Sequence, residues 1–426
     1  MASRQLGQLT AFIVIAATTV AMMFSASAPS PLYPVYQELW GFSSFTLTVI
    51  FAVYVIALLA GLLTVGSLSD HIGRRPVLLG GLAMMAVSMV MFAFADGVPM
   101  LIAARILQGL AAGALTGTLS ATIVDLQPNP RIGSVTSSAA PLGGLAFGAI
   151  VAGILIEYAP MPRELIFLIL IAAFAISAVL IAFVPETSAR AGFDSRRHLW
   201  RVLRPSAGLP PSVRGVFLTS TFGVLAVWSL GGLTLSLGSS IVPRIFGVEN
   251  HMATGFILGT FFTCGALGSA ATSKWSAERK VAIGLGSLGT GLIINLIGTM
   301  SATLPIYLLG SAIAGFGFGA TFAGIMAVLI AATGPEQRGQ VFSTLFVVSY
   351  IGFSIPAVIG GIAVGHFGLR PTAIGYSIYV LVLVVVAGIA AFLRGRSARR
   401  VRPEPFDEPI RTDLVTVAAD MTDTSR

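Results

Sequence analysis

Twelve apolar runs dominate this sequence, and each is about as long as a helix that crosses a lipid bilayer, roughly 20 residues. Lipid offers no partner to an unpaired backbone group, so a spanning segment must be a helix or a strand of a closed barrel. Barrel strands have about ten residues of alternating polarity, whereas these runs are longer and apolar on every side. The sequence therefore predicts an all-α integral membrane protein. The runs are 9–27, 44–67, 76–95, 99–123, 132–156, 164–184, 214–237, 252–273, 280–300, 304–331, 340–365 and 371–393.

The composition excludes several classes of protein. Only 10% of the 426 residues are charged, against about 25% in an average soluble domain. The single cysteine, Cys264, cannot form an intrachain disulfide, and four scattered histidines form no ligand cluster, so we expect neither a disulfide framework nor a metal site. The sequence has no nucleophile–base pair and no nucleotide-binding loop. We therefore expect a protein that is not an enzyme and uses no cofactor.

The basic residues predict the orientation of the chain. With the N-terminus in the cytoplasm, 21 of the 25 Lys and Arg residues fall on the cytoplasmic side and three fall outside, while Arg105 lies within a span. This bias predicts cytoplasmic termini in a multi-pass protein of the cytoplasmic (inner) cell membrane. It also accounts for the net charge of +8 without nucleic acid as a partner.

The start of the chain has a second interpretation. Arg4, the following apolar stretch and Ala26-Ser27-Ala28 are similar to a secretory signal with its cleavage site. Cleavage would leave eleven spans and would reverse every loop relative to the basic residues. We therefore interpret this stretch as the first span.

The runs divide into two sets of six. The longest cytoplasmic connection, 185–213, separates an N-terminal half, 1–184, from a C-terminal half, 214–393. Similar segments recur between the halves at an offset of 204 to 207 residues, which predicts two pseudo-symmetric six-helix units around a central cavity. We expect residues 394–426 to form a disordered cytoplasmic tail.

The loop between the second and third spans reads Gly66-Ser67-Leu68-Ser69-Asp70-His71-Ile72-Gly73-Arg74-Arg75-Pro76. This pattern resembles the signature of the major facilitator superfamily in the same loop. The resemblance implies a gating role for Gly66, Asp70, Gly73 and Arg74: Asp70 would lie at the N-terminus of helix 11, and its contact with Arg74 would latch the cytoplasmic side shut. In the second half, Lys274 replaces the acid, so we expect no second latch there.

The fourth span contains Arg105-Ile106-Leu107-Gln108-Gly109, which is similar to a second motif of the family. An arginine buried in a membrane costs at least a few kcal/mol and is a functional candidate by default. The resemblance implies contact with the helix 1 backbone and a role in proton coupling; the alternative is a structural arginine that helix 1 carbonyls satisfy. We treat Arg105, Gln108 and Asp125 as candidates for coupling or for substrate contact.

Small residues mark the expected helix contacts. Gly109 and Gly113 form a ridge on the fourth span, and Gly148 and Gly153 lie on the fifth, with Pro356 at the position related by the repeat to Ala149. Antiporters of the family typically have Gly-Pro where this chain has Gly148-Ala149. The missing proline counts against antiport but leaves the predicted fold unchanged.

Ionisable side chains are absent from the middle of the spans, apart from Arg105. A coupling acid would therefore have to be Asp70, Asp125, Glu157 or Glu38, which lie at helix ends or in an outer loop. The substrate cavity should then be lined by neutral side chains. The candidates are Tyr54, Thr116, Trp228, Asn295, Phe346 and Tyr350.

Together these features predict a secondary transporter that works by alternating access, and the resemblance implies that it acts as a monomer. The resemblance is to prokaryotic drug and metabolite efflux proteins, which implies export of a small apolar or neutral compound in exchange for protons, with the lipid bilayer as surroundings. The alternative within the same class is uptake, facilitated or by symport, of a neutral or anionic metabolite that Arg105 would pair with. The alternative from another class is a membrane sensor that does not transport.

Overall fold

The computed structural model describes residues 5–65, 68–188, 192, 208–334 and 337–400. Every regular element in this part of the chain is helical. Among the described residues, eleven helices are long and apolar enough to cross a membrane, and a twelfth apolar helix is shorter. The prediction of an all-α membrane fold is confirmed.

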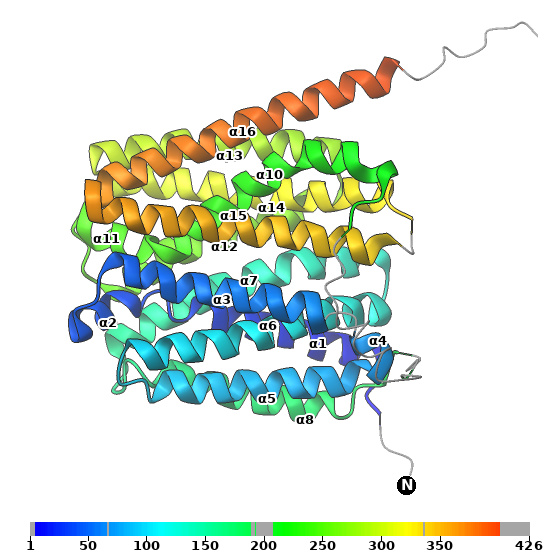
Figure 1. Ribbon diagram of the computed structural model, residues 1–426, viewed down its shortest axis with the longest axis horizontal. Coiled ribbons are helices and arrows are strands. Elements are labelled where there is room, and N and C mark those ends of the chain that lie inside the picture. Colours follow the sequence, from blue (N-terminus) through cyan, green and yellow to red (C-terminus); the bar gives the residue numbers. More distant parts are fainter. Residues whose placement is uncertain (1–4, 66–67, 189–191, 193–207, 335–336, 401–426) are drawn as a thin grey trace, which may run out of the picture.

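The N-terminal half contains the first six of these helices together with two short ones. The short helices, α2 and α4, were not among the predicted spans, and each lies at an end of the bundle (Figure 1). The elements are α1 (Gln8–Ser27), α2 (Tyr33–Trp40), α3 (Ser44–Val65), α4 (Leu68–Ile72), α5 (Arg74–Ala93), α6 (Val98–Leu126), α7 (Pro130–Tyr158) and α8 (Leu165–Ile181).

The C-terminal half repeats this arrangement. Its short helix α11 follows the seventh long helix, and a single 3₁₀ turn, η1, ends the eighth. The elements are α10 (Pro211–Ser236), α11 (Gly238–Phe246), α12 (His251–Ala271), η1 (Thr272–Lys274), α13 (Ala277–Ser301), α14 (Leu304–Ala332), α15 (Arg338–Phe367) and α16 (Leu369–Arg400).

Two helix boundaries differ from the predicted domain limits. Helix α10 begins at Pro211, inside the predicted linker, because proline is well suited to the first turn of a helix. Helix α16 continues to Arg400, past the predicted start of the tail. The greater part of the linker, the tail from residue 401 onward and Gly66 lie outside the described residues.

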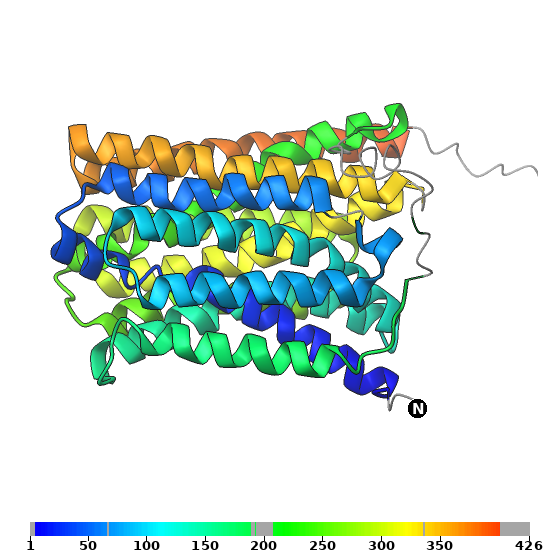
Figure 2. The same ribbon diagram turned by 60° about the horizontal axis from the view of Figure 1, so that its bottom comes forward.

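The halves form two groups of helices that lie against each other (Figures 1 and 2). They meet along two seams, one between α7 and α12 and one between α3 and α15. We call the end with α4 and Arg74 the basic end and the end with α2 and α11 the far end. The sequence predicts that the basic end faces the cytoplasm.

Glycines set the helix spacing inside each half and between the halves. A Cβ on Gly113 would collide with the α3 backbone at Leu58 and Leu62, so α6 and α3 approach closely there. Gly153 on α7 and Gly255 on α12 face each other in the same way across the seam. Lipid does not drive helices together, and such close approach supplies the dispersion contacts that hold them.

Candidate functional site

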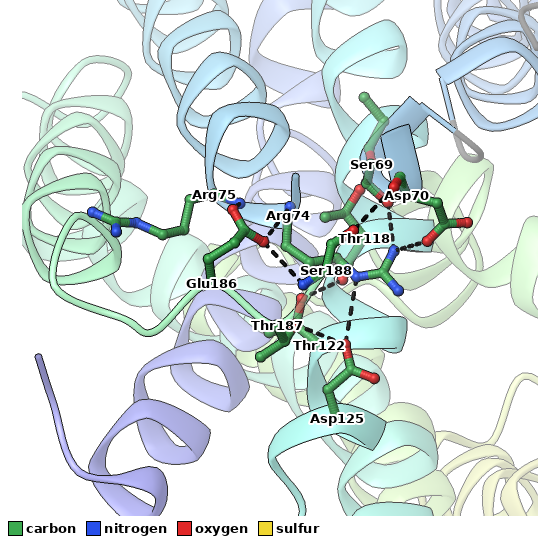
Figure 3. A network of polar contacts seen from close by, with 11 residues as sticks. Ser69, Asp70, Arg74, Arg75, Thr118, Thr122, Asp125, Glu186, Thr187 and Ser188 are labelled. Carbon is green, nitrogen blue, oxygen red and sulfur yellow. Dashed lines mark hydrogen bonds and ion pairs between the residues drawn. The ribbon is translucent and has the colours of Figure 1, made fainter. Parts of the chain in front are cut away.

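Arg74 lies at the centre of a polar network at the basic end (Figure 3). Its Nη1 atom lies 2.6 Å from Asp70 Oδ1 and also donates to Ser69 Oγ at 2.6 Å. Its Nε atom lies 3.5 Å from Asp125 Oδ2, at the end of α6. The Arg74 side chain is only 14% exposed, so one largely buried guanidinium pairs with carboxylates from two different helices.

The start of α5 is held by residues that are distant in the sequence. Gly73 has a φ of +105°, which favours glycine and allows the sharp turn between α4 and α5. The backbone N–H groups of Arg74 and Arg75 then donate to Glu186, at 2.7 and 3.3 Å. A carboxylate at a helix N-terminus satisfies amides that lack an intrahelical partner and is stabilised by the helix dipole.

The segment after α8 completes this network (Figure 3). Thr187 Oγ1 donates to Asp125 Oδ2 at 2.8 Å, and Ser188 Oγ donates to the Asp70 carbonyl at 3.0 Å. Glu186, Thr187 and Ser188 were not predicted as site residues, because they fall in the predicted linker. The available signal was an acidic residue followed by two hydroxyl residues, directly after the last apolar run of the N-terminal half.

The predicted contact between Asp70 and the eleventh span, which corresponds to α15, differs from the ion pair between Asp70 and Arg74. The contacts of Asp70 with other described residues lie within its own half and the segment after α8, and its side chain is 59% exposed. The structure thus forms the pair that the resemblance implies for Asp70 and Arg74. The role of this pair as a latch against α15 stays a prediction.

Arg105 is fully buried and has neutral hydrogen-bond partners. Its Nε atom donates to Tyr33 Oη at 3.0 Å, its Nη2 atom donates to the same oxygen, and its Nη1 atom donates to Gln108 Oε1 at 2.7 Å. Gln108 in turn donates to the Ser25 carbonyl of α1 at 2.8 Å. The helix 1 backbone is therefore reached through Gln108, and Tyr33 of α2 is a partner that the sequence did not indicate.

Aromatic rings surround the Arg105 guanidinium on several sides. Its Cζ atom lies 5.6, 5.2 and 5.5 Å from the ring centroids of Tyr33, Tyr54 and Phe92, within the range of cation–π attraction. No carboxylate of the described residues lies within ion-pair distance of Arg105. Burial raises the pKa of the neighbouring Tyr36 in α2, so this hydroxyl stays neutral.

A cluster of aromatic side chains lies where the halves meet along α3 and α15. The Trp228 ring lies 5.5 Å from Tyr350 and 5.7 Å from Phe353, measured between centroids. Phe353 also lies 5.0 Å from Phe51 of the N-terminal half. The cluster comprises Phe51, Trp228, Phe318, Phe322, Phe346, Tyr350 and Phe353.

The remaining predicted residues lie in several different places. Thr116 is buried and bonds to the Ala112 carbonyl of its own helix at 2.7 Å. Asn295 bonds to Ser311 Oγ at 2.8 Å and lines a small cavity inside the C-terminal half.

The predicted packing residues also divide by location. Gly109 packs on α3, Gly148 on α1 and Gly153 on α12. Pro356 lines an apolar groove of about 510 Å³ between α15 and α16.

Comparison with known proteins agrees with this architecture. The family model described as Major Facilitator Superfamily matches residues 15–286 and 232–419. The human organic anion transporter MFSD10 (TETRAN) has a similar structure, with a TM-score of 0.64, 18% identity and coverage of 90% of this chain and 100% of that chain. At this identity the likeness shows the fold alone.

Two bacterial relatives are similar in sequence. The "Multi-drug resistance efflux pump PmrA homolog" of Lactococcus lactis is 25% identical over 349 residues, 78% of this chain and 82% of that protein. An "Uncharacterized transporter" of Rickettsia bellii is 28% identical over 175 residues, 40% of this chain, and the match spans only 43% of that relative's length. On the match of the family model, the chain belongs to the Major Facilitator Superfamily, and it is a multi-pass membrane transporter and not an enzyme.

Proposed function

We propose that this transporter exports a small apolar or neutral compound across the cytoplasmic membrane by alternating access, in exchange for protons. The observation that carries the proposal is the aromatic cluster between the halves. Trp228, Tyr350 and Phe353 from the C-terminal half meet Phe51 from the N-terminal half at this position. Aromatic faces bind apolar and planar compounds, and they would bind a strongly hydrated ion poorly.

The name of the Lactococcus lactis relative supports export over uptake, since that protein is called a multi-drug resistance efflux pump. In the exchange, rocking of the two halves would expose the cluster to either side in turn. The network of Asp70, Arg74 and Asp125 would hold the basic end of the N-terminal half in one arrangement. Its carboxylates, those of Asp70 and Asp125, are among the acids at that end to which a proton could bind.

The experiment is dye and drug flux in proteoliposomes, with and without an imposed pH gradient. We expect gradient-driven flux of an apolar dye, reduced at least about fivefold in Trp228→Ala and lost in Asp70→Asn. Thr116→Val is the matched control, because its hydroxyl serves its own helix. A rate of flux that does not depend on the pH gradient would contradict proton exchange. A normal rate of dye flux in Trp228→Ala would contradict the proposed substrate site.

One observation favours a second function, transport of an anionic metabolite. Arg105 is a buried cation whose described partners, Tyr33 and Gln108, are both neutral. An anionic substrate would supply the missing charge. Uptake of a labelled carboxylate that disappears in Arg105→Gln, while apolar dyes are not moved by the wild type, would establish this alternative.

A further inference from the structure

Two hydrogen bonds between described residues join the halves, and both lie on the seam between α7 and α12. Near the basic end, Ser269 Oγ donates to Ser138 Oγ at 2.6 Å. At the far end, the backbone N–H of His251 donates to Glu157 Oε2 at 2.9 Å. The first bond joins two neutral hydroxyl groups, whereas the second uses a carboxylate.

The far-end bond places this carboxylate on a helix N-terminus. His251 is the first residue of α12, so its N–H has no acceptor within the helix. Asn250 satisfies a different amide, that of Ala253, at 2.8 Å. Glu157, the last residue but one of α7, thus adds a charge-assisted bond and a favourable interaction with the α12 dipole.

The helix contact beneath this bond is bare of side chains. A Cβ on Gly153 would lie 2.6 Å from the His251 carbonyl oxygen and 2.9 Å from Gly255 Cα. The backbones therefore touch directly, and this contact depends on dispersion alone, without a side chain that interlocks. Dispersion between the two backbones holds this contact, and Glu157 adds the polar and charged part of the attachment at the far end.

We propose that Glu157 is the far-side gate of this transporter: its carboxylate holds the N-terminus of α12 to the end of α7, and loss of its charge lets the far end open. The gate rests on the proposed function insofar as a gate requires alternating access. A proton that binds Glu157 from the far side removes the negative charge that the helix dipole stabilises. The gate is therefore sensitive to the pH of the far compartment.

Other ionisable groups at this end could also respond to pH, and the experiment has to separate them from Glu157. His251 is the closest of these, because its own backbone is the donor. Arg163 and Glu164, on the connection after α7, form an ion pair of 3.2 Å with each other. The groups on the helices that meet here and on their connections are Tyr158, Arg163, Glu164, Arg244, Glu249 and His251.

The gate can be tested by measuring the width of the far end directly. Spin labels at exposed Met161 and Phe367, introduced as cysteines into full-length Cys264→Ser protein in lipid nanodiscs, report the distance between the halves. We expect acidification from pH 7.5 to 4.0, into the range in which carboxyl groups take up protons, to raise the ratio of far-open to far-closed molecules about twofold. Glu157→Gln should show the raised ratio at both pH values, although Gln can still accept the hydrogen bond.

Matched variants make the result specific. His251→Gln keeps the backbone donor, so it should behave as the wild type at both pH values, and Ser138→Ala should leave the far-end distance unchanged. Glu157→Asp, which keeps the charge, should retain a pH response and guards against a Gln variant that fails to fold. A Glu157→Gln distribution identical to the wild type, or a pH response that disappears in His251→Gln, would overturn the proposal. If the spin-label distances respond as expected but the protein shows no proton-driven flux, the gate would stand and the proposed exchange for protons would be rejected.

Discussion

The loop before α5 and the repeat-related turn before α13 begin equivalent helices but are held in different ways. The N-cap residue of helix α5 is Gly73, which has a positive φ and no side-chain cap, and Glu186 from the segment after α8 accepts from the first amides of the helix. The N-cap residue of helix α13 is Ser276, whose hydroxyl caps the amide of Arg279 at 3.3 Å. Arg279 then lies over the Trp275 ring, 4.7 Å from its centroid.

The difference shows which of the two loops does more than begin a helix. The turn before α13 is satisfied by its own residues, as any helix start can be. The loop before α5 depends on Asp70 of α4, Asp125 of α6 and Glu186, so it connects three separate parts of the N-terminal half. A helix N-terminus that is held by residues from other elements can change when those residues move. A gating element must respond in this way.

The largest effect is expected from Arg74→Ala. This change leaves Asp70 and Asp125 without the cation that they share. We expect the rate of dye efflux from proteoliposomes to fall at least about tenfold, which corresponds to about 1.4 kcal/mol. Arg279→Ala is the control in the other half and should stay within twofold of the wild type. Equal losses in both variants would remove the contrast between the loops.

A smaller effect is expected from Gly73→Ala. An alanine with a φ near +105° is strained, and we expect a loss of about 1–2 kcal/mol in unfolding free energy, measured by denaturation in detergent. Gly80→Ala on the same helix has open space around the added methyl group and should not lower stability. If both variants were equally stable, the turn before α5 would not need glycine.

The smallest effect is expected from Ser276→Ala. Loss of the N-cap should cost about 1 kcal/mol of stability. The flux rate should stay unchanged, because the cap serves its own helix. Ser276→Asp, which can also cap, should restore the stability in the same denaturation assay. A flux defect in Ser276→Ala with normal stability would show that this turn also takes part in gating.

Part of the candidate site could be predicted because its residues are close in the sequence. Arg105 and Gln108 are three residues apart on α6, a spacing at which side chains meet on one helix face. Asp70 and Arg74 are four residues apart, on either side of the turn at Gly73, and the loop motif identified them. The partners Tyr33 and Glu186 could not be predicted in this way. Each lies on another element, and only the packing of α2 and of the segment after α8 brings it into contact.

The cavity candidates show the same division. Trp228, Tyr350 and Phe346 were selected as neutral residues within spans, and they do lie together. Asn295 was selected by the same criterion, but it bonds to Ser311 within the C-terminal half. A sequence in which nearly every face of a helix is apolar does not show which face meets the partner half.

The sequence by itself determined that this chain spans a membrane as helices, because a bilayer permits few other ways to satisfy the backbone. It also determined the organisation into two halves, since both the loop motif and the repeated segments can be identified from the order of the residues. The tertiary structure decided which residues meet across the halves. Glu157 and His251 are joined only because Gly153 and Gly255 let α7 and α12 come close. In lipid, helices associate through close packing, and how closely two helices pack depends on the residues at the surfaces of both.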